Sequence, residues 1–212
     1  MRCLLCQSRS DTFSQDKKRE YKHCKHCDLI FVPLKYHLSP SQEKKEYDQH
    51  ENDSSDCKYR NFLNQALIPL EKYLIPGMQG LDFGSGPGPT LHLMLEEKGY
   101  LMKHYDPFFA PHDSLLHTQY DFVTSTEVVE HFNHPQKSWS LLASLVKKGG
   151  YLAVVTLFWD SVIKANFSTW WYKNIPSHVV FYFYKTLGWI GKSFSLHLIY
   201  AKNRVAVFQK LR

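Results

Sequence analysis

Two pairs of cysteines near the start of the chain carry the most specific chemistry in the sequence. Each pair is spaced Cys-x-x-Cys, seventeen residues separate them, and the four members are Cys3, Cys6, Cys24 and Cys27. Pairs separated by about 15–20 residues can bring four thiolates tetrahedrally onto one Zn²⁺. Because four sulfur ligands leave no coordination position for water, the spacing predicts a structural zinc site that stabilises a segment too small to fold alone.

Two other uses of these cysteines are less typical. Disulfides need an oxidising compartment, whereas residues 1–6 do not resemble a signal peptide and a fifth cysteine, Cys57, has no pair. His23 and His26 flank the second pair and could replace a cysteine as ligand, but the four cysteines fit the spacing without them. We therefore expect reduced cysteines and a cytoplasmic protein.

A glycine-rich turn is the second signal. The apolar strand expected at residues 80–83 runs into Gly-Ser-Gly-Pro-Gly at residues 84–88. Such a turn lets the backbone pass close to a nucleotide-like ligand at the carboxyl end of a parallel sheet. The dinucleotide fingerprint Gly-x-Gly-x-x-Gly is incomplete, because its third glycine would fall on Pro89. Asp106 follows Gly86 by twenty residues and ends the next expected strand, where an acidic side chain can accept hydrogen bonds from ribose hydroxyls.

A third polar group follows another expected strand, at residues 121–125. This strand continues into Thr126 and Glu127, and the motif Glu-x-x-Glu-His then ends at His131. The order of the elements places these side chains at the mouth of the same crevice. Imidazole is the side chain best suited to act as a general base near neutral pH, although a packing role is the other reading of this histidine.

The elements that must position these residues alternate between strand and helix patterns. An apolar stripe predicts a helix from Tyr59 to Leu74, which Pro69 should kink or shorten. We further expect strands at 80–83, 100–105, 121–125 and 151–156, helices at 90–98, 135–148 (two lysines in its last turn) and 184–190, and a hairpin of 196–200 with 205–208. The alternation predicts a parallel sheet covered on both faces, to which the hairpin adds one antiparallel strand.

Composition and charge restrict the class of protein. The chain has 212 residues, 43% hydrophobic and 22% charged, which is typical of one soluble globular domain with a small appendage. The longest stretch without a charged residue, 83–95, is too short to span a membrane, which takes about 18 residues. The net charge of +6 is dispersed, with 12 basic and 10 acidic residues in 1–60 and 14 and 10 in the remainder. A nucleic-acid binder more often concentrates its basic residues on one element.

With these motifs in place, residues 59–210 resemble a class I S-adenosylmethionine-dependent methyltransferase. The resemblance is carried by the glycine-rich first motif at 82–88, the acidic second motif at 105–107, a segment at 121–131 similar to that of ubiquinone-biosynthesis O-methyltransferases, and later segments at 147–152 and 178–182. Residues 21–31 resemble the zinc ribbon that precedes the catalytic domain in various sugar and small-molecule methyltransferases, with Asp28 where glycine is usual.

The resemblance implies a fold, boundaries and two bound groups. The fold would be α/β, a Rossmann-like doubly wound sheet with a terminal antiparallel hairpin, preceded by a small zinc ribbon. The ribbon would cover residues 1–38, a polar connector 39–58 and the methyltransferase domain 59–212. S-adenosylmethionine would be the cofactor and Zn²⁺ a structural ion. The interval from Asp106 to Asp121 is short, so it leaves little room for the family's third strand.

Roles for single residues follow from the same resemblance. The residues expected to bind the cofactor are Asp82, Gly84, Ser85, Gly86, Asp106, Pro107, Asp113, Ser114, Thr126 and Glu127. His131 is the first choice for a general base and His178 the second, with a structural role as the alternative for each. The link at 157–177 is rich in aromatic residues and forms either a lid over the methyl acceptor or a packed cap without contact to it.

Three functions are compatible with these sequence features. The first is a methyltransferase acting on a small-molecule acceptor. The second is an RNA methyltransferase that uses the zinc ribbon to dock RNA, and the balanced charge of residues 1–60 counts against it because phosphate contacts need clustered Lys and Arg. The third is a cofactor-binding module without turnover, and the glycine-rich turn together with Asp106 argues against it.

Overall fold

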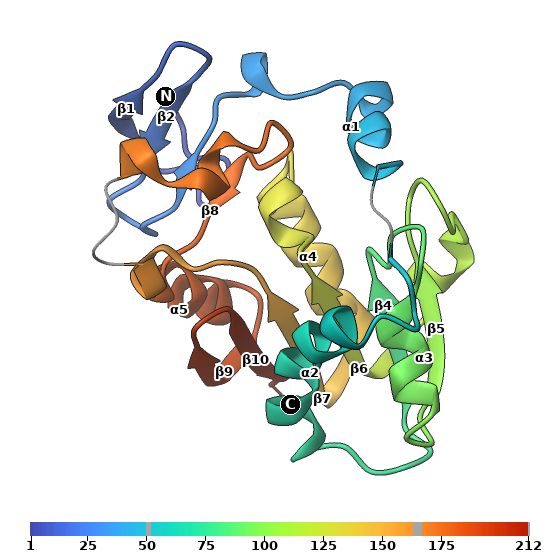
Figure 1. Cartoon of the computed structure of the whole chain (residues 1–212). Helices are drawn as coiled ribbons and strands as arrows, with labels where there is room; N and C mark the ends of the chain where they lie inside the picture. The colour runs from blue at the N-terminus through green and yellow to red at the C-terminus, as the bar shows by residue number, and fades with distance from the viewer. Residues whose placement is uncertain (50–51, 163–166, 212) are drawn as a thin grey trace.

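The computed structural model describes residues 1–49, 52–162 and 167–211. Its strands form two sheets, a small one in the order β1-β2-β3-β8 and a large one in the order β5-β4-β6-β7-β10-β9 (Figure 1). The strands are β1 (Asp11–Gln15), β2 (Glu20–His23), β3 (Ile30–Phe31), β4 (Gln79–Phe83), β5 (Leu101–Tyr105), β6 (Tyr120–Thr126), β7 (Val146–Val155), β8 (Val180–Phe181), β9 (Leu196–Lys202) and β10 (Val205–Lys210).

Five α-helices and several short 3₁₀ helices connect the described strands. The α-helices are α1 (Pro40–Tyr47), α2 (Cys57–Glu71), α3 (Thr90–Glu96), α4 (Pro135–Leu145) and α5 (Tyr184–Ser193). The 3₁₀ helices are η1 (Leu34–Tyr36), η2 (Asp113–His117), η3 (Val129–His131), η4 (Trp159–Val162), η5 (Phe167–Thr169) and η6 (Trp171–Asn174). Among the described helices, none combines the length and the apolar character that a membrane span requires.

The large sheet is doubly wound, as the sequence predicts. Strands β5, β4, β6 and β7 run parallel, and β10 is the antiparallel strand between β7 and β9. Side chains alternate along a strand, so β7 sends Leu152 and Val154 to one face and Ala153 and Val155 to the other. Apolar residues of α4 and α5 pack on the first face, and those of α2 and α3 on the second. The prediction of an α/β sheet covered on both faces is confirmed.

The prediction of a helix at 135–148 is wrong at its C-terminal end. Helix α4 stops at Leu145, and Val146 already lies in β7, where it pairs with Tyr120 of β6. Lys147 therefore extends from a strand and forms an ion pair with Asp121 at 2.8 Å instead of capping the helix. Pairing with the neighbouring strand prevails here over the helical pattern of the sequence. As expected from the short interval after β5, only η2 lies between β5 and β6 among the described elements.

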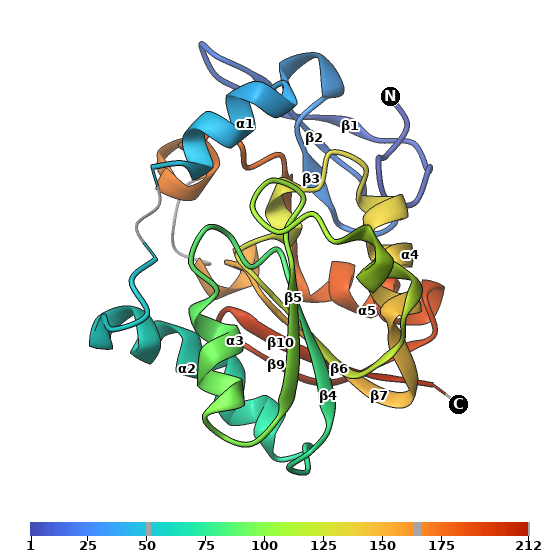
Figure 2. The same cartoon turned by 90° about the vertical axis from the view of Figure 1, so that its right-hand side faces the viewer.

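The small sheet joins the two ends of the sequence. Strands β1, β2 and β3 come from the cysteine-rich segment, and β8 comes from the last quarter of the chain. Ile30 pairs with Phe181 and Phe31 with Val180, all four of which are buried. Figure 2 shows the cysteine-rich segment and α1 gathered at one end of the molecule, beyond the large sheet. The appendage expected from the sequence is thus built into the main domain through a shared sheet.

Candidate functional site

A cavity of about 600 Å³ lies where β4, β5 and β6 end. Its lining includes the glycine-rich turn after β4, the ends of β5 and β6, helix α1 of the connector, and the segment that contains η6, together with residues of α2, α3 and α4. A crevice beyond the carboxyl ends of parallel strands is the usual ligand site of open α/β sheets.

The glycine-rich turn is held by the backbone of β5. The amides of Gly84 and Ser85 both donate to the carbonyl oxygen of Tyr105, at 2.8 and 3.2 Å. Gly84 and Gly86 have φ values of +79° and +66°, in the left-handed region that favours glycine. A Cβ atom on Gly84 would overlap the side chain of Val128. The turn therefore depends on glycine both for its backbone conformation and for close packing.

Asp106 connects the turn to the end of β5. Its Oδ2 accepts a hydrogen bond from the amide of Gly86 at 3.0 Å, and its Oδ1 accepts from the amides of Phe108 and Phe109 at 2.8 and 3.1 Å. The residue is 7% exposed and lines the cavity beside Pro107. A carboxylate offers about four acceptor positions, so these three bonds leave room for a ligand hydroxyl.

Asp82 lies deeper, at the end of β4. Thr124 donates its hydroxyl to Oδ1 of Asp82 at 2.8 Å. Burial raises the pKa of Asp82 to about 7, because the cost of a charged carboxylate away from water exceeds the stabilisation by Thr124. The cavity therefore has an acidic group at its base that titrates near neutral pH.

Four buried polar atoms of the cavity lining have no hydrogen-bond partner among the described residues. They are Ser85 Oγ, Thr126 Oγ1, Glu127 Oε1 and Asn133 Oδ1. The other oxygen of Glu127 accepts from Arg204 Nη2 at 2.8 Å, and burial followed by the neighbouring Glu130 raises the pKa of Glu127 to about 8. Buried polar groups without a partner are rare, so such atoms in a cavity indicate a ligand that satisfies them.

S-adenosylmethionine fits this lining. Glycines with positive φ allow the cofactor to approach the backbone closely, and the four unpartnered polar atoms offer it hydrogen bonds. Carboxyl groups at the wall come from Glu43, Asp82, Asp106 and Glu127. The ammonium and sulfonium charges of such a ligand would favour their ionised forms and lower the pKa values of Asp82 and Glu127, which burial raises. Asp113 and Ser114 are not among the described residues that line the cavity, and their contact with the cofactor stays a prediction.

Two histidines stand together at another part of the wall. The rings of His131 and His178 lie 4.7 Å apart, and Nδ1 of each contacts a backbone carbonyl, that of Ser177 at 3.1 Å and that of Tyr172 at 3.0 Å. Burial, and next the charge of His131, lowers the pKa of His178 to about 2, so this ring is neutral at pH 7. The geometry brings together both histidines named from the sequence.

A buried carboxyl group lies next to these histidines without lining the cavity. Glu130 is fully buried, and its Oε1 accepts a hydrogen bond from the hydroxyl group of Tyr172 at 2.5 Å. Burial raises the pKa of Glu130 to about 7. One ligand-type atom each from Glu130, His131 and His178 lies within 4.8 Å of the other two. Glu130, His131 and His178 thus form one cluster, in which Glu130 and His178 titrate over different pH ranges.

The aromatic link at 157–177 is largely a packed cap. Phe167, Trp170 and Tyr172 are buried, and they pack against Tyr21 of β2 and Phe181 of β8. Trp171 differs, since it is 59% exposed and lines the cavity together with Tyr172. Residues 163–166 of this link lie outside the described residues. Of the two readings left open by the sequence, packing explains most of the rings, and Trp171 and Tyr172 are the ones at the cavity.

Helix α1 is the part of the site that the sequence reasoning missed. It lies in the segment expected to be a polar connector and brings Glu43, Glu46 and Tyr47 to the cavity. A signal was available: Ser39 precedes a proline, and its amide donates to the side chain of Gln42 at 2.9 Å. Ser-x-x-Gln with proline at the first helical position is a typical helix start.

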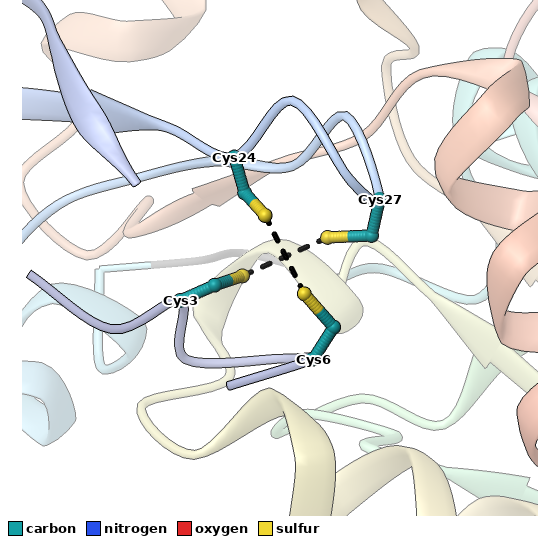
Figure 3. A group of neighbouring side chains, drawn as sticks. All are labelled: Cys3, Cys6, Cys24 and Cys27. Carbon is teal, nitrogen blue, oxygen red and sulfur yellow. Dashed lines mark hydrogen bonds between the residues drawn. The ribbon is translucent and has the colours of Figure 1, made fainter. Parts of the chain in front are cut away.

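The four cysteines lie in one cluster at the base of the small sheet (Figure 3). The Sγ atoms of Cys3 and Cys27 are 3.6 Å apart, and those of Cys6 and Cys24 are 3.4 Å apart. Zn–S bonds of about 2.3 Å in a tetrahedron separate the sulfur atoms by roughly 3.8 Å. The cluster is therefore compatible with the tetrahedral zinc site expected from the spacing.

Comparison with known proteins identifies the family. A family model described as a methyltransferase domain matches residues 50–200. Magnesium protoporphyrin IX methyltransferase from Synechocystis PCC 6803, solved with bound S-adenosylhomocysteine, is 13% identical, with 84% of this chain and 97% of that chain covered and a TM-score of 0.56. The 1,6-didemethyltoxoflavin-N1-methyltransferase of Burkholderia thailandensis is 12% identical, with 95% and 100% covered and a TM-score of 0.52. No curated protein matches the sequence. The chain belongs to the methyltransferase domain family and is a class I S-adenosylmethionine-dependent methyltransferase.

Proposed function

We propose that the protein transfers a methyl group from S-adenosylmethionine to a small-molecule acceptor bound in the cavity. The observation that carries this proposal is the cavity itself, whose volume of about 600 Å³ is typical of small-molecule sites and whose lining includes α1 and Trp171 and Tyr172 of the aromatic cap. The carboxyl groups of Glu43 and Glu46 at its wall disfavour the phosphates of RNA. The two similar methyltransferases are named for small-molecule acceptors, which agrees with this choice.

One side of the cavity is proposed to bind the cofactor and another to bind the acceptor. The cofactor side comprises residues 82–88, 105–107, 126 and 127. S-adenosylmethionine supplies an activated methyl group when it is bound. We propose that the turn at 84–86 lies against its methionine and ribose, that Asp106 with Pro107 meets the ribose hydroxyls, and that Thr126 and Glu127 border the site of transfer. Asp113 and Ser114 remain the proposed contacts at the adenine.

The acceptor side comprises His131 and residues 171–178. Because Nδ1 of His131 lies against the carbonyl oxygen of Ser177, we propose that Nδ1 donates there and that Nε2 takes the acceptor's proton. His178, with its pKa near 2, is a poor base at neutral pH, so its proposed part is to accept a hydrogen bond from the acceptor through Nε2. In-line positioning accounts for the remaining catalysis, since the methyl group is already activated.

The cysteine cluster and the domain limits complete the proposal. Cys3, Cys6, Cys24 and Cys27 would hold one structural Zn²⁺, supported by their sulfur distances. The ribbon would span residues 1–38, the connector 39–58 and the methyltransferase domain 59–212. Four reduced cysteines suit the cytoplasm, which we propose as the location.

A turnover screen tests the function. The protein is incubated with S-adenosylmethionine carrying a labelled methyl group and with three acceptor pools: hydroxylated aromatic compounds including quinols, sugars, and RNA. We expect label in one of the small-molecule pools, identified by mass spectrometry. Label in RNA alone, retained at 0.2 M salt, would replace this proposal by the RNA methyltransferase.

A further inference from the structure

One arginine of the ribbon is bound to the acceptor side of the cavity. Arg19 precedes β2 and is 7% exposed. Its Nη1 donates to the carbonyl oxygen of Pro176 at 3.0 Å, and its Nη2 donates to those of Ile175, at 3.0 Å, and Lys173. Its Nε donates to the hydroxyl of Tyr21 at 3.0 Å. Four of the five N–H groups of the guanidinium are therefore used, and three of these bonds go to one short segment more than 150 residues away.

Burial of the Arg19 guanidinium costs free energy, which its contacts must offset. A buried guanidinium loses its hydration, and none of the described carboxylates forms an ion pair with Arg19. The charge is stabilised by the three carbonyl oxygens and by the ring of Tyr21, 5.4 Å from the guanidinium carbon. Those carbonyls are in place only when the segment 173–176 is in its present conformation. Arg19 and this segment thus hold each other in position.

The same segment carries the groups proposed to act on the acceptor. Tyr172 and His178 flank it, and the Nδ1 proton of His178 is donated to the carbonyl oxygen of Tyr172. Ser177, whose carbonyl orients His131, follows Pro176 directly. A shift of residues 173–176 would therefore turn both imidazole rings at once.

Backbone contacts from the ribbon reinforce this connection without replacing it. The amide of Val32 donates to the carbonyl of Val179 at 2.8 Å, and the amide of Val179 donates to that of Glu130 at 2.9 Å. Lys173 is further held by Asp16 at 2.8 Å, on the same loop as Arg19. The strand pairing fixes the far end of the segment at residue 179. Among the described side-chain contacts of the ribbon, Arg19, Asp16 and the hydroxyl of Tyr21, which donates to the carbonyl of Lys173 at 3.4 Å, hold residues 173–176.

We propose that Arg19 is a positioning residue for methyl transfer: from the ribbon, it fixes the segment 173–176 and thereby sets the orientation of His131 and His178. The proposal rests on the proposed function in that these histidines face the acceptor. It gives the ribbon a part in the reaction beyond the stability of residues 1–38. Arginine is required because one planar fork reaches three carbonyls, whereas the single ammonium of lysine cannot.

Nitrogen-15 NMR of the histidine rings tests the proposal without any acceptor. The samples are the zinc-loaded protein with S-adenosylhomocysteine added, as wild type, Arg19→Lys, Arg19→Met and the control Arg9→Met, whose arginine side chain is 91% exposed on the same ribbon. In wild type and control we expect His178 to be neutral, with its proton on Nδ1, from pH 5 to 8. In both Arg19 variants we expect mixed tautomers and titration of His178 near the ordinary value of about 6.5, because water enters as the segment moves.

Calorimetry separates positioning from general damage. Affinity for S-adenosylhomocysteine should change less than about twofold in Arg19→Lys, since the cofactor side is held by β4 and β5, and the zinc content should stay at that of wild type. Unchanged tautomers and titration of His131 and His178 in a folded Arg19 variant would overturn the proposal. If Arg19→Lys and Arg19→Met both fail to fold, the residue is structural and the proposal is abandoned. None of these measurements depends on turnover, so failure to find a methyl acceptor would affect the proposed function alone.

Discussion

The cofactor side and the acceptor side of the cavity are built in different ways. On the cofactor side, the turn after β4 is held by Tyr105 and Asp106 of the neighbouring strand, within a stretch of about 25 residues. On the acceptor side, Arg19 holds residues 173–176, and β3 pairs with β8. The glycine-rich turn is therefore held by a nearby stretch of sequence, whereas the proposed acceptor side depends on parts of the chain that meet only in the folded protein. A methyltransferase can in this way change its acceptor while keeping its cofactor.

Loss of the proposed zinc ion should produce the largest difference between the two sides of the cavity. We expect Cys24→Ser to lose the metal and unfold the ribbon, because binding of structural Zn²⁺ contributes on the order of 10 kcal/mol in small domains. Methylation should be abolished, while affinity for S-adenosylhomocysteine should fall by less than about tenfold. Elemental analysis, calorimetry and the turnover assay measure these effects, with Cys57→Ser as control, since Cys57 is exposed at the start of α2. Full activity in a zinc-free protein would refute the role of the ribbon.

Loss of the proposed base should affect the acceptor side alone. General bases contribute roughly 10²–10⁴-fold to a rate, so His131→Ala should lower kcat by about that factor. Its affinity for the cofactor should remain within about twofold of wild type. Steady-state kinetics with the acceptor from the turnover screen, beside calorimetry with S-adenosylhomocysteine, checks both parts. A variant with undiminished kcat would assign His131 a structural role.

The buried carboxyl group of Asp82 should make stability depend on pH. Its pKa is about 7 in the folded protein and near 3.8 in the unfolded chain, so the unfolded state releases its proton first as the pH rises. Stability from this group therefore decreases between about pH 4 and pH 7 and then levels off, by roughly 2–4 kcal/mol. Asp82→Asn, which keeps the oxygen that accepts from Thr124, should flatten the profile. Urea unfolding of both proteins from pH 4.5 to 7.5 measures it, and identical slopes would contradict the assignment.

Substitution of Asp106 tests the cofactor side of the cavity. Asp106→Ala removes the proposed ribose contacts and three hydrogen bonds to backbone amides, so affinity for S-adenosylmethionine should fall by about tenfold or more and thermal stability should also fall. Asp106→Asn keeps the shape but loses the charge and should lie between. Calorimetry with S-adenosylmethionine and with nicotinamide dinucleotides compares them. Tight binding by Asp106→Ala, or preference of the wild type for the dinucleotide, would disprove this use of the crevice.

The same division explains what could be predicted from the sequence. The large sheet was predictable because its helices and strands follow local apolar periods and because the turn at 84–88 has a recognisable composition. The end of α4 was mistaken, since the pairing of Val146 with Tyr120 depends on a strand that is distant in sequence. The contributions of Arg19 and Glu43 to the cavity region were missed for a related reason: no local pattern records a contact made across the whole chain.

The shared small sheet also has a consequence for how the protein is made. Strand β3 leaves the ribosome early, but its partner β8 follows some 150 residues later, because Ile30 pairs with Phe181. Until then the edge of β3 and its apolar side chains have no cover, which is the condition under which nascent chains pair with one another. The proposed zinc ion would have all four of its cysteine ligands once Cys27 has emerged, so it would keep the ribbon compact until β8 is made. Metal supply during synthesis, more than metal supply afterwards, would then decide how much protein reaches the native state.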